Sequence, residues 1–203
     1  LVYGPDGESP VDDSDLTEHL DSQMYELAYV NIPLYNTSTF VSASDDQKAQ
    51  MLQLAQAAAA SCSETQDGSV SEQVSALHSA ASAALPDIYA VLGSTPSDTN
   101  VRTELLGSST LDSTFTQSGS ADTIRNLAYG QAAAVQYSSY AMMLALRVDP
   151  LSVASLDDLR DQVITDMKTS ELKTALSDYG ASLENHLDTS AMNKLPMTKI
   201  VNK

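Results

Sequence analysis

Apolar residues recur at helical spacing along most of the chain. The first run lies at i, i+4, i+8 and i+11, which places Leu16, Leu20, Met24 and Leu27 on one helix face. Asp15 followed by Glu18 forms a capping box, so we expect this helix to begin near Asp15. Pro33 is expected to end it, and residues 33–43 are predicted to form an extended linker.

Two further helices are predicted over 44–62 and 69–92. Each begins with a serine followed three residues later by Gln or Glu, which is the capping-box pattern: Ser44 with Gln47, and Ser69 with Glu72. Pro86 is expected to kink or divide the second of them, and Gly93 is expected to end it.

The longest pattern runs from Ser120 to Arg147. Residues 126–146 carry no formal charge, and this length invites a transmembrane interpretation. Several Asn, Gln, Ser and Tyr side chains would be costly in hydrocarbon, however. We therefore favour the buried central helix of a bundle, small and apolar on nearly all sides.

The remaining segments also read as helical. A short helix is expected over 99–106, closed by Gly107, and two more are expected to begin near Ser155 and Ser170. No alternating strand signal is found. The predicted fold is all-α, an irregular bundle of five to seven helices around a long uncharged central helix, with extended N- and C-terminal arms. The predicted parts are an N-terminal arm (1–13), a helical bundle domain (14–190) and a basic C-terminal arm (191–203).

Charge is distributed unequally along the 203 residues, whose formal net charge is −17. The first 101 residues hold fifteen acids and one base, whereas the last ten residues hold three lysines and no acid. This excess of acid argues against direct nucleic-acid binding and against anionic membrane surfaces. Because the two ends of the chain differ in charge, we instead expect protein partners, which can include copies of the same chain.

The sequence contains little that is typical of a catalytic site. The sequence contains no Gly-rich phosphate loop, no HExxH and no CxxC. His19, His78 and His186 lie on separate predicted helices, without a second ligand at helical spacing. Ser170 and Lys173 match the S-x-x-K pattern, but Ser170 is better explained as a helix cap. We therefore expect no enzymatic activity, no catalytic residue, no metal site and no cofactor.

A tyrosine- and methionine-rich set remains. Five of its members lie on the uncharged segment: Tyr129, Tyr137, Tyr140, Met142 and Met143. Residues of this kind can line a pocket for an apolar ligand or pigment. Ordinary core packing explains them more simply, because a tyrosine can bury its ring while its hydroxyl reaches water.

These observations favour a non-enzymatic structural or assembly subunit of a larger complex, particle or filament, whose terminal arms contact neighbouring subunits. The alternative is an exported soluble helical binding protein for a small apolar ligand or pigment. The first residue is Leu1 rather than Met, so an exported, lumenal or particle-associated protein after processing is slightly favoured over a cytosolic one. A glycosylation sequon at Asn36 adds little, because such triplets arise by chance.

Overall fold

The computed structural model describes residues 11–62, 67–96 and 100–182. The chain divides into two compact units, residues 1–167 and 168–203. Of the predicted arms, residues 1–10 and 191–203 lie outside the described residues. Asp12 accepts hydrogen bonds from the backbone N–H groups of Ser14 and Asp15, so the first helix begins within the predicted N-terminal arm.

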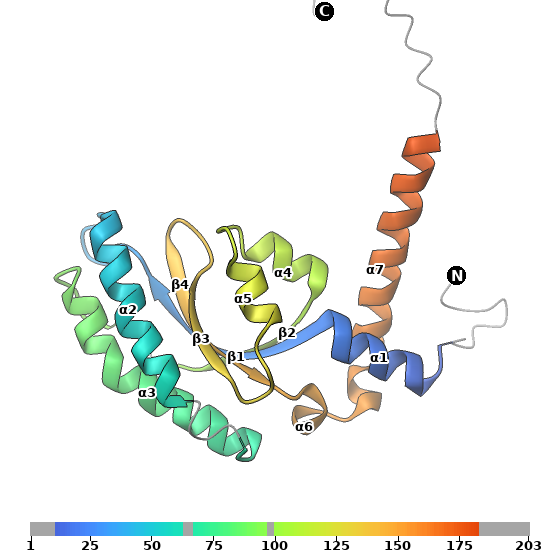
Figure 1. The fold of residues 1–203 in the computed structure, drawn as a ribbon, viewed down its shortest axis with the longest axis horizontal. Coiled ribbons are helices and arrows are strands. Elements are labelled where there is room, and N and C mark those ends of the chain that lie inside the picture. The colour runs from blue at the N-terminus through green and yellow to red at the C-terminus, as the bar shows by residue number, and fades with distance from the viewer. Residues whose placement is uncertain (1–10, 63–66, 97–99, 183–203) are drawn as a thin grey trace, which may run out of the picture. The chain divides into compact units, whose positions relative to one another are not determined.

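The first unit is built on a four-stranded antiparallel sheet of order β2-β1-β4-β3 (Figure 1). Its strands are β1 (Met24–Pro33), β2 (Arg102–Gly107), β3 (Ala132–Gln136) and β4 (Ala141–Val148). Central β1 pairs with β2 through Leu27 and Glu104 and with β4 through Leu27 and Arg147. The two central strands are therefore contributed by distant parts of the chain.

Helices cover both faces of the sheet. Helices α2 (Asp45–Cys62) and α3 (Val70–Ala90) pack on the face that carries Ala28, Val30 and Ile32. The short helices α4 (Ser108–Thr114) and α5 (Ser120–Arg125) lie on the opposite face, with Leu27. Both faces of the central strands are consequently buried.

A third cluster forms at the start of β1. Helix α1 (Asp13–Gln23) and the first part of α7 (Leu156–Ser182) bury Leu16, Leu20, Val163 and Ile164 around Met24. The short helix α6 (Pro150–Val153) links β4 to α7, with Pro150 at its first position and Asp149 as its cap. In the second unit, the described residues 168–182 continue α7.

The all-α prediction is wrong, because the fold mixes helices with an antiparallel sheet. The predicted central helix over 120–147 is α5 followed by the β3–β4 hairpin, and the predicted helix over 99–106 contains most of β2. The first predicted helix stops at Gln23, and its last apolar residues belong to β1. Strand residues buried on both faces do not alternate with polar ones, which removes the usual strand signal.

Two helix predictions are confirmed. Helix α2 begins after Ser44, which exchanges side-chain and backbone hydrogen bonds with Gln47. Helix α3 has the same arrangement at Ser69 and Glu72 and continues through Pro86 as one helix. The helices expected near Ser155 and Ser170 form one continuous helix instead. None of the helices within the described ranges has the length and apolar character that crossing a membrane requires.

Candidate protein-docking surface

The loop between β1 and α2 is held in place by backbone hydrogen bonds. The Leu34 N–H donates to the Tyr140 carbonyl at 2.7 Å, and the Ala43 N–H donates to the Leu34 carbonyl at 2.8 Å. Tyr35 and Ser42 form an isolated antiparallel bridge between these points. Residues 34–43 thus form a closed loop with fixed ends, anchored to the turn between β3 and β4.

Asn36 organises the tip of this loop. Its Oδ1 accepts hydrogen bonds from the backbone N–H groups of Ser38 and Thr39, both at 3.0 Å. Its Nδ2 donates to the Leu92 carbonyl at the end of α3, at 2.9 Å. An Asn that bonds its own turn favours a fixed loop conformation. The atom to which a sequon sugar would be attached is therefore engaged in the fold.

Phe40 occupies a conformation that is unusual for its residue type. Its φ angle is +56°, and it is the only non-glycine residue with positive φ among those described. The Phe40 N–H donates to the Asn36 carbonyl at 2.7 Å, and its ring stacks on Tyr35 with 6.3 Å between centroids. The left-handed region costs a side chain about 1–2 kcal/mol. The loop bears this strain while leaving 78% of Phe40 exposed.

Other exposed apolar residues lie at the same end of the sheet. Val41 follows Phe40 in the loop, and Tyr140 lies in the β3–β4 turn that the loop bonds to; both are 64% exposed. We call Phe40, Val41 and Tyr140 the aromatic docking surface. Exposed strained residues on loops of a rigid scaffold are typical of binding sites. Covering large apolar side chains that are exposed to water contributes a favourable free energy of binding.

The local sequence predicts an extended linker around Phe40 and gives this residue no role. An aromatic side chain among Ser and Thr residues was the available signal for its exposure. Its backbone strain and the bond from Asn36 to Leu92 depend on contacts between distant segments, which no local pattern reports.

The five residues of the predicted Tyr/Met pocket are dispersed. Tyr137 and Met143 lie in the cluster covered by α4 and α5, where Tyr137 also contacts Phe115. Met142 belongs to the opposite face, under α2 and α3. Tyr140 is exposed, and Tyr129 precedes β3 in a loop. The structure brings only the first two into one cluster, and that cluster is part of the core.

The phenol groups of Tyr137 and Tyr129 are partly buried, and each makes a hydrogen bond within the fold. The Tyr137 hydroxyl donates to Asn31 Oδ1 at 3.0 Å. Burial raises the pKa of Tyr137. Burial also raises the pKa of Tyr129, assisted by the charge of Asp21. Both phenols therefore remain protonated at neutral pH.

Arg147 on β4 lies between two tyrosine rings. Its guanidinium carbon is 4.9 Å from the Tyr25 centroid and 5.0 Å from the Tyr129 centroid. One terminal nitrogen donates to the Leu127 carbonyl at 2.8 Å. Cation–π contacts of this kind are stronger when they are shielded from water. Arg147 thus joins the sheet to the α5–β3 loop, which is a structural role.

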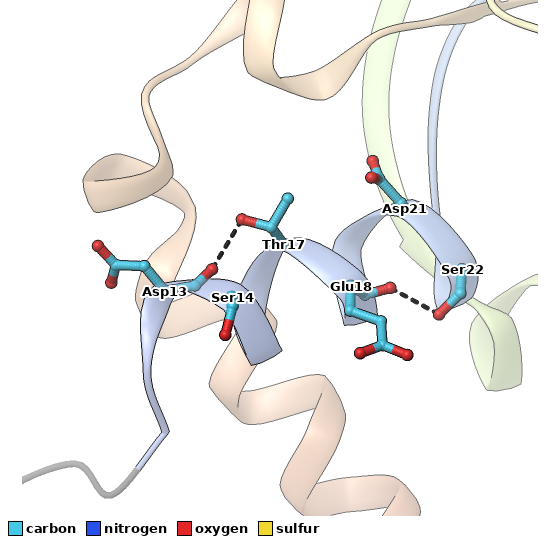
Figure 2. Close-up of a pocket in the computed structure, with 6 residues that line it drawn as sticks. All are labelled: Asp13, Ser14, Thr17, Glu18, Asp21 and Ser22. Carbon is cyan, nitrogen blue, oxygen red and sulfur yellow. Dashed lines mark hydrogen bonds between the residues drawn. The ribbon is translucent and has the colours of Figure 1, made fainter.

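An acidic depression lies along α1, as Figure 2 shows. Its lining hydroxyls are used within the helix, because Thr17 Oγ1 donates to the Asp13 carbonyl and Ser22 Oγ donates to the Glu18 carbonyl. Asp13 also pairs with Arg160. Across residues 11–62, 67–96 and 100–182, no group of three or more His, Cys, Asp or Glu side chains could hold a metal ion.

The other candidates with reactive or metal-binding side chains are three histidines, one cysteine and Ser170. His19 contacts Asp166, whereas His78 is exposed on α3. His186 lies outside the described residues. Cys62 is buried and donates its thiol to the Ala58 carbonyl, and burial raises its pKa. Ser170 lies inside α7, so the prediction that it caps a helix is wrong.

Compared with known proteins, the chain matches no family model, no curated sequence and no solved structure.

Proposed function

We propose that this chain is a non-enzymatic structural subunit that assembles with other proteins through the aromatic docking surface. The observation that carries the proposal is Phe40, which is 78% exposed and has a φ angle of +56°. A turn selected only for stability would place glycine at this position, because glycine adopts positive φ without a steric penalty.

The energetics favour a protein partner. Covering a phenylalanine side chain contributes about 1.5–3 kcal/mol, and aromatic residues dominate the binding energy of many interfaces. Tyr140 can bury its ring and keep its hydroxyl bonded, as is common at interfaces. The loop is already held by Asn36, so little conformational entropy is lost when it binds.

The proposal is tested by site-specific photo-cross-linking in the cells that make the protein. Benzoylphenylalanine replaces Phe40, and the same group at Val153 on α6, which is 47% exposed, is the control. We expect cross-links to another protein subunit from position 40 and none from position 153. A native species with the mass of one 21.6 kDa chain and no cross-link from position 40 would overturn the proposal.

A further inference from the structure

Strand β2 leaves one edge of the sheet open from Arg102 to Glu104, before Leu105 meets α7. It pairs with β1 on one side and is the last strand of the sheet on the other. Backbone hydrogen-bonding groups of an antiparallel strand point alternately to its two sides. The Leu105 carbonyl accepts a hydrogen bond from Gln162 Nε2 of α7 at 3.0 Å, on the side away from β1. By the same alternation, the N–H and carbonyl of Thr103 also point to the open edge.

The register of the whole sheet agrees with this assignment. The Tyr137 N–H donates to the Ala141 carbonyl, so odd-numbered residues of β4 face β3 and even-numbered ones face β1. Odd-numbered residues of β1 then face β2, where Leu27 is opposite Glu104. Thr103 is left facing outward, and its backbone makes no hydrogen bond with any described residue.

The open edge is exposed and carries both signs of charge. Arg102, Thr103 and Glu104 are all exposed, and Glu104 accepts a hydrogen bond from the Tyr29 hydroxyl at 3.2 Å. Arg102 and Glu104 project to one face of the strand. Val101, Thr103 and Leu105 project to the other, and Val101 and Leu105 are half-buried.

Charged residues on an edge strand usually discourage pairing with other strands. On β2, however, the order of Arg102 and Glu104 is self-complementary, so two antiparallel copies of the strand can pair opposite charges. When two copies of β2 lie antiparallel about a two-fold axis at Thr103, Arg102 is opposite the partner's Glu104, and Glu104 is opposite the partner's Arg102. The same register places Val101 opposite the partner's Leu105, whose carbonyl already accepts the Gln162 bond, so the backbone pairing centres on Thr103.

The neighbouring symmetric registers are unfavourable. A shift of the axis by one residue, to Arg102 or Glu104, keeps outward-facing backbone groups opposite each other. Those positions place Arg102 opposite the partner's Arg102, or Glu104 opposite the partner's Glu104. Like charges directly opposite each other destabilise a strand pair. Charge therefore favours the register centred on Thr103 over these two, and in that register the two Thr103 backbones exchange hydrogen bonds.

We propose that a second copy of this chain occupies the open edge, with its β2 antiparallel to the first and the two-fold axis at Thr103. The two sheets then meet edge to edge along residues 102–104 of each β2. Isologous pairing of this kind is the commonest symmetry of soluble assemblies. The inference goes beyond the proposed function, because it uses a different surface and is tested by a different measurement.

Sedimentation velocity over a range of protein concentrations tests the pairing. Wild type is expected to reach twice the mass of one chain. Glu104→Arg or Arg102→Glu converts both cross-strand pairs to like charges, so each single variant should raise the dissociation constant about tenfold or more. Asp46→Arg, at an exposed position on α2, matches the charge change of Glu104→Arg and should not alter association.

Two rescue experiments separate pairing from general damage to the fold. The double variant Arg102→Glu/Glu104→Arg restores opposite charges and should recover the dimer. A mixture of the two single variants should form a heterodimer, because each then offers the charges that the other lacks. Circular dichroism and thermal unfolding establish that each variant is folded.

Clear outcomes would overturn the inference. A wild type that stays monomeric at every concentration would do so, as would folded single variants that dimerise like wild type, or a mixture that fails to associate. A monomeric wild type that still cross-links from position 40 refutes the β2 pairing alone. A charge-dependent dimer without cross-links from position 40 supports the pairing and counts against the aromatic docking surface.

Discussion

His19 on α1 contacts Asp166 on α7, with 2.9 Å between Nε2 and Oδ2, and both side chains are largely buried. The Asp166 carboxyl lies against Gly107, the last residue of β2. A Cβ built on Gly107 would be 1.8 Å from Asp166 Oδ1. This contact therefore requires glycine at the end of the strand.

Gly107→Ala should displace the Asp166 carboxyl and break its contact with His19. We expect a loss of about 1–3 kcal/mol in the free energy of unfolding, which is typical of overpacking a closed site. In a His19→Ala background, Asp166 is free to rotate, so the same substitution should cost less. Urea unfolding of the double-mutant cycle measures this coupling.

Gly180→Ala is the matched control, because a Cβ there meets no atom within 4 Å, and alanine favours a helix. It should leave stability unchanged or slightly raised. Equal costs of Gly107→Ala in the wild-type and His19→Ala backgrounds would contradict the coupling of Gly107, Asp166 and His19.

Glu26 is a buried carboxyl in the middle of the sheet, 6% exposed and paired in register with Leu105 and Val148. Burial, followed by the charge of Glu104, raises its pKa above the ordinary value of 4.5. The folded state therefore binds this proton more tightly than the unfolded state. The contribution of protonated Glu26 to the stability of the fold is therefore fully present below pH 4.5. It is lost as pH rises through the pKa of Glu26 in the folded state.

Glu26→Gln should accordingly stabilise the protein at pH 7 to 8, because it removes a buried negative charge. The difference from wild type should shrink as pH falls toward 4.5. Chemical unfolding across this pH range measures it, with exposed Glu18→Gln on α1 as the control. A Glu26→Gln effect that does not vary with pH would contradict the raised pKa.

Phe40 allows stability to be separated from docking. Phe40→Gly and Phe40→Ala both remove the ring, but only glycine accepts the φ angle of +56° without strain. We expect the glycine variant to be more stable than the alanine variant by about 1 kcal/mol. At neighbouring Val41, where φ is not positive, the order should reverse.

Thermal and urea unfolding of the four variants provide the comparison. Placing the cross-linker at Tyr140 in the two Phe40 variants then measures docking, and cross-linking should fall in both. An alanine variant at position 40 as stable as the glycine variant would show that the loop is not strained there.

Local signals account for what the sequence predicted correctly. The capping boxes at Ser44 and Ser69 and the apolar stripes that follow them define α2 and α3 without reference to the rest of the chain. The apolar spacing of Leu16 and Leu20 located helix α1, but its N-cap is Asp12 and not the predicted Asp15. Its end was misplaced because Met24 and Leu27 continue the helical spacing by coincidence into a strand.

The sheet was missed because its strands satisfy tertiary rather than local rules. Residues 141–148 contain Ala, Met and Leu, which favour helices, yet β4 is central and packed on both faces. The glycine at position 130, with a φ angle of +77°, allows the turn before β3. Similarly, Asn36 reads as a sequon, and its contact with Leu92 exists only once α3 is in place.

The position of β1 has a consequence for biosynthesis. β1 is synthesised before both of its neighbours, because β2 and β4 follow only after α2 and α3 are made. Glu26 meets Val148 near the end of the first unit, so the apolar core of the sheet stays open while most of that unit is made. Long-range pairing of this kind folds slowly and exposes the nascent chain to aggregation. The acidic first half supplies the mutual repulsion that keeps such unfinished chains apart.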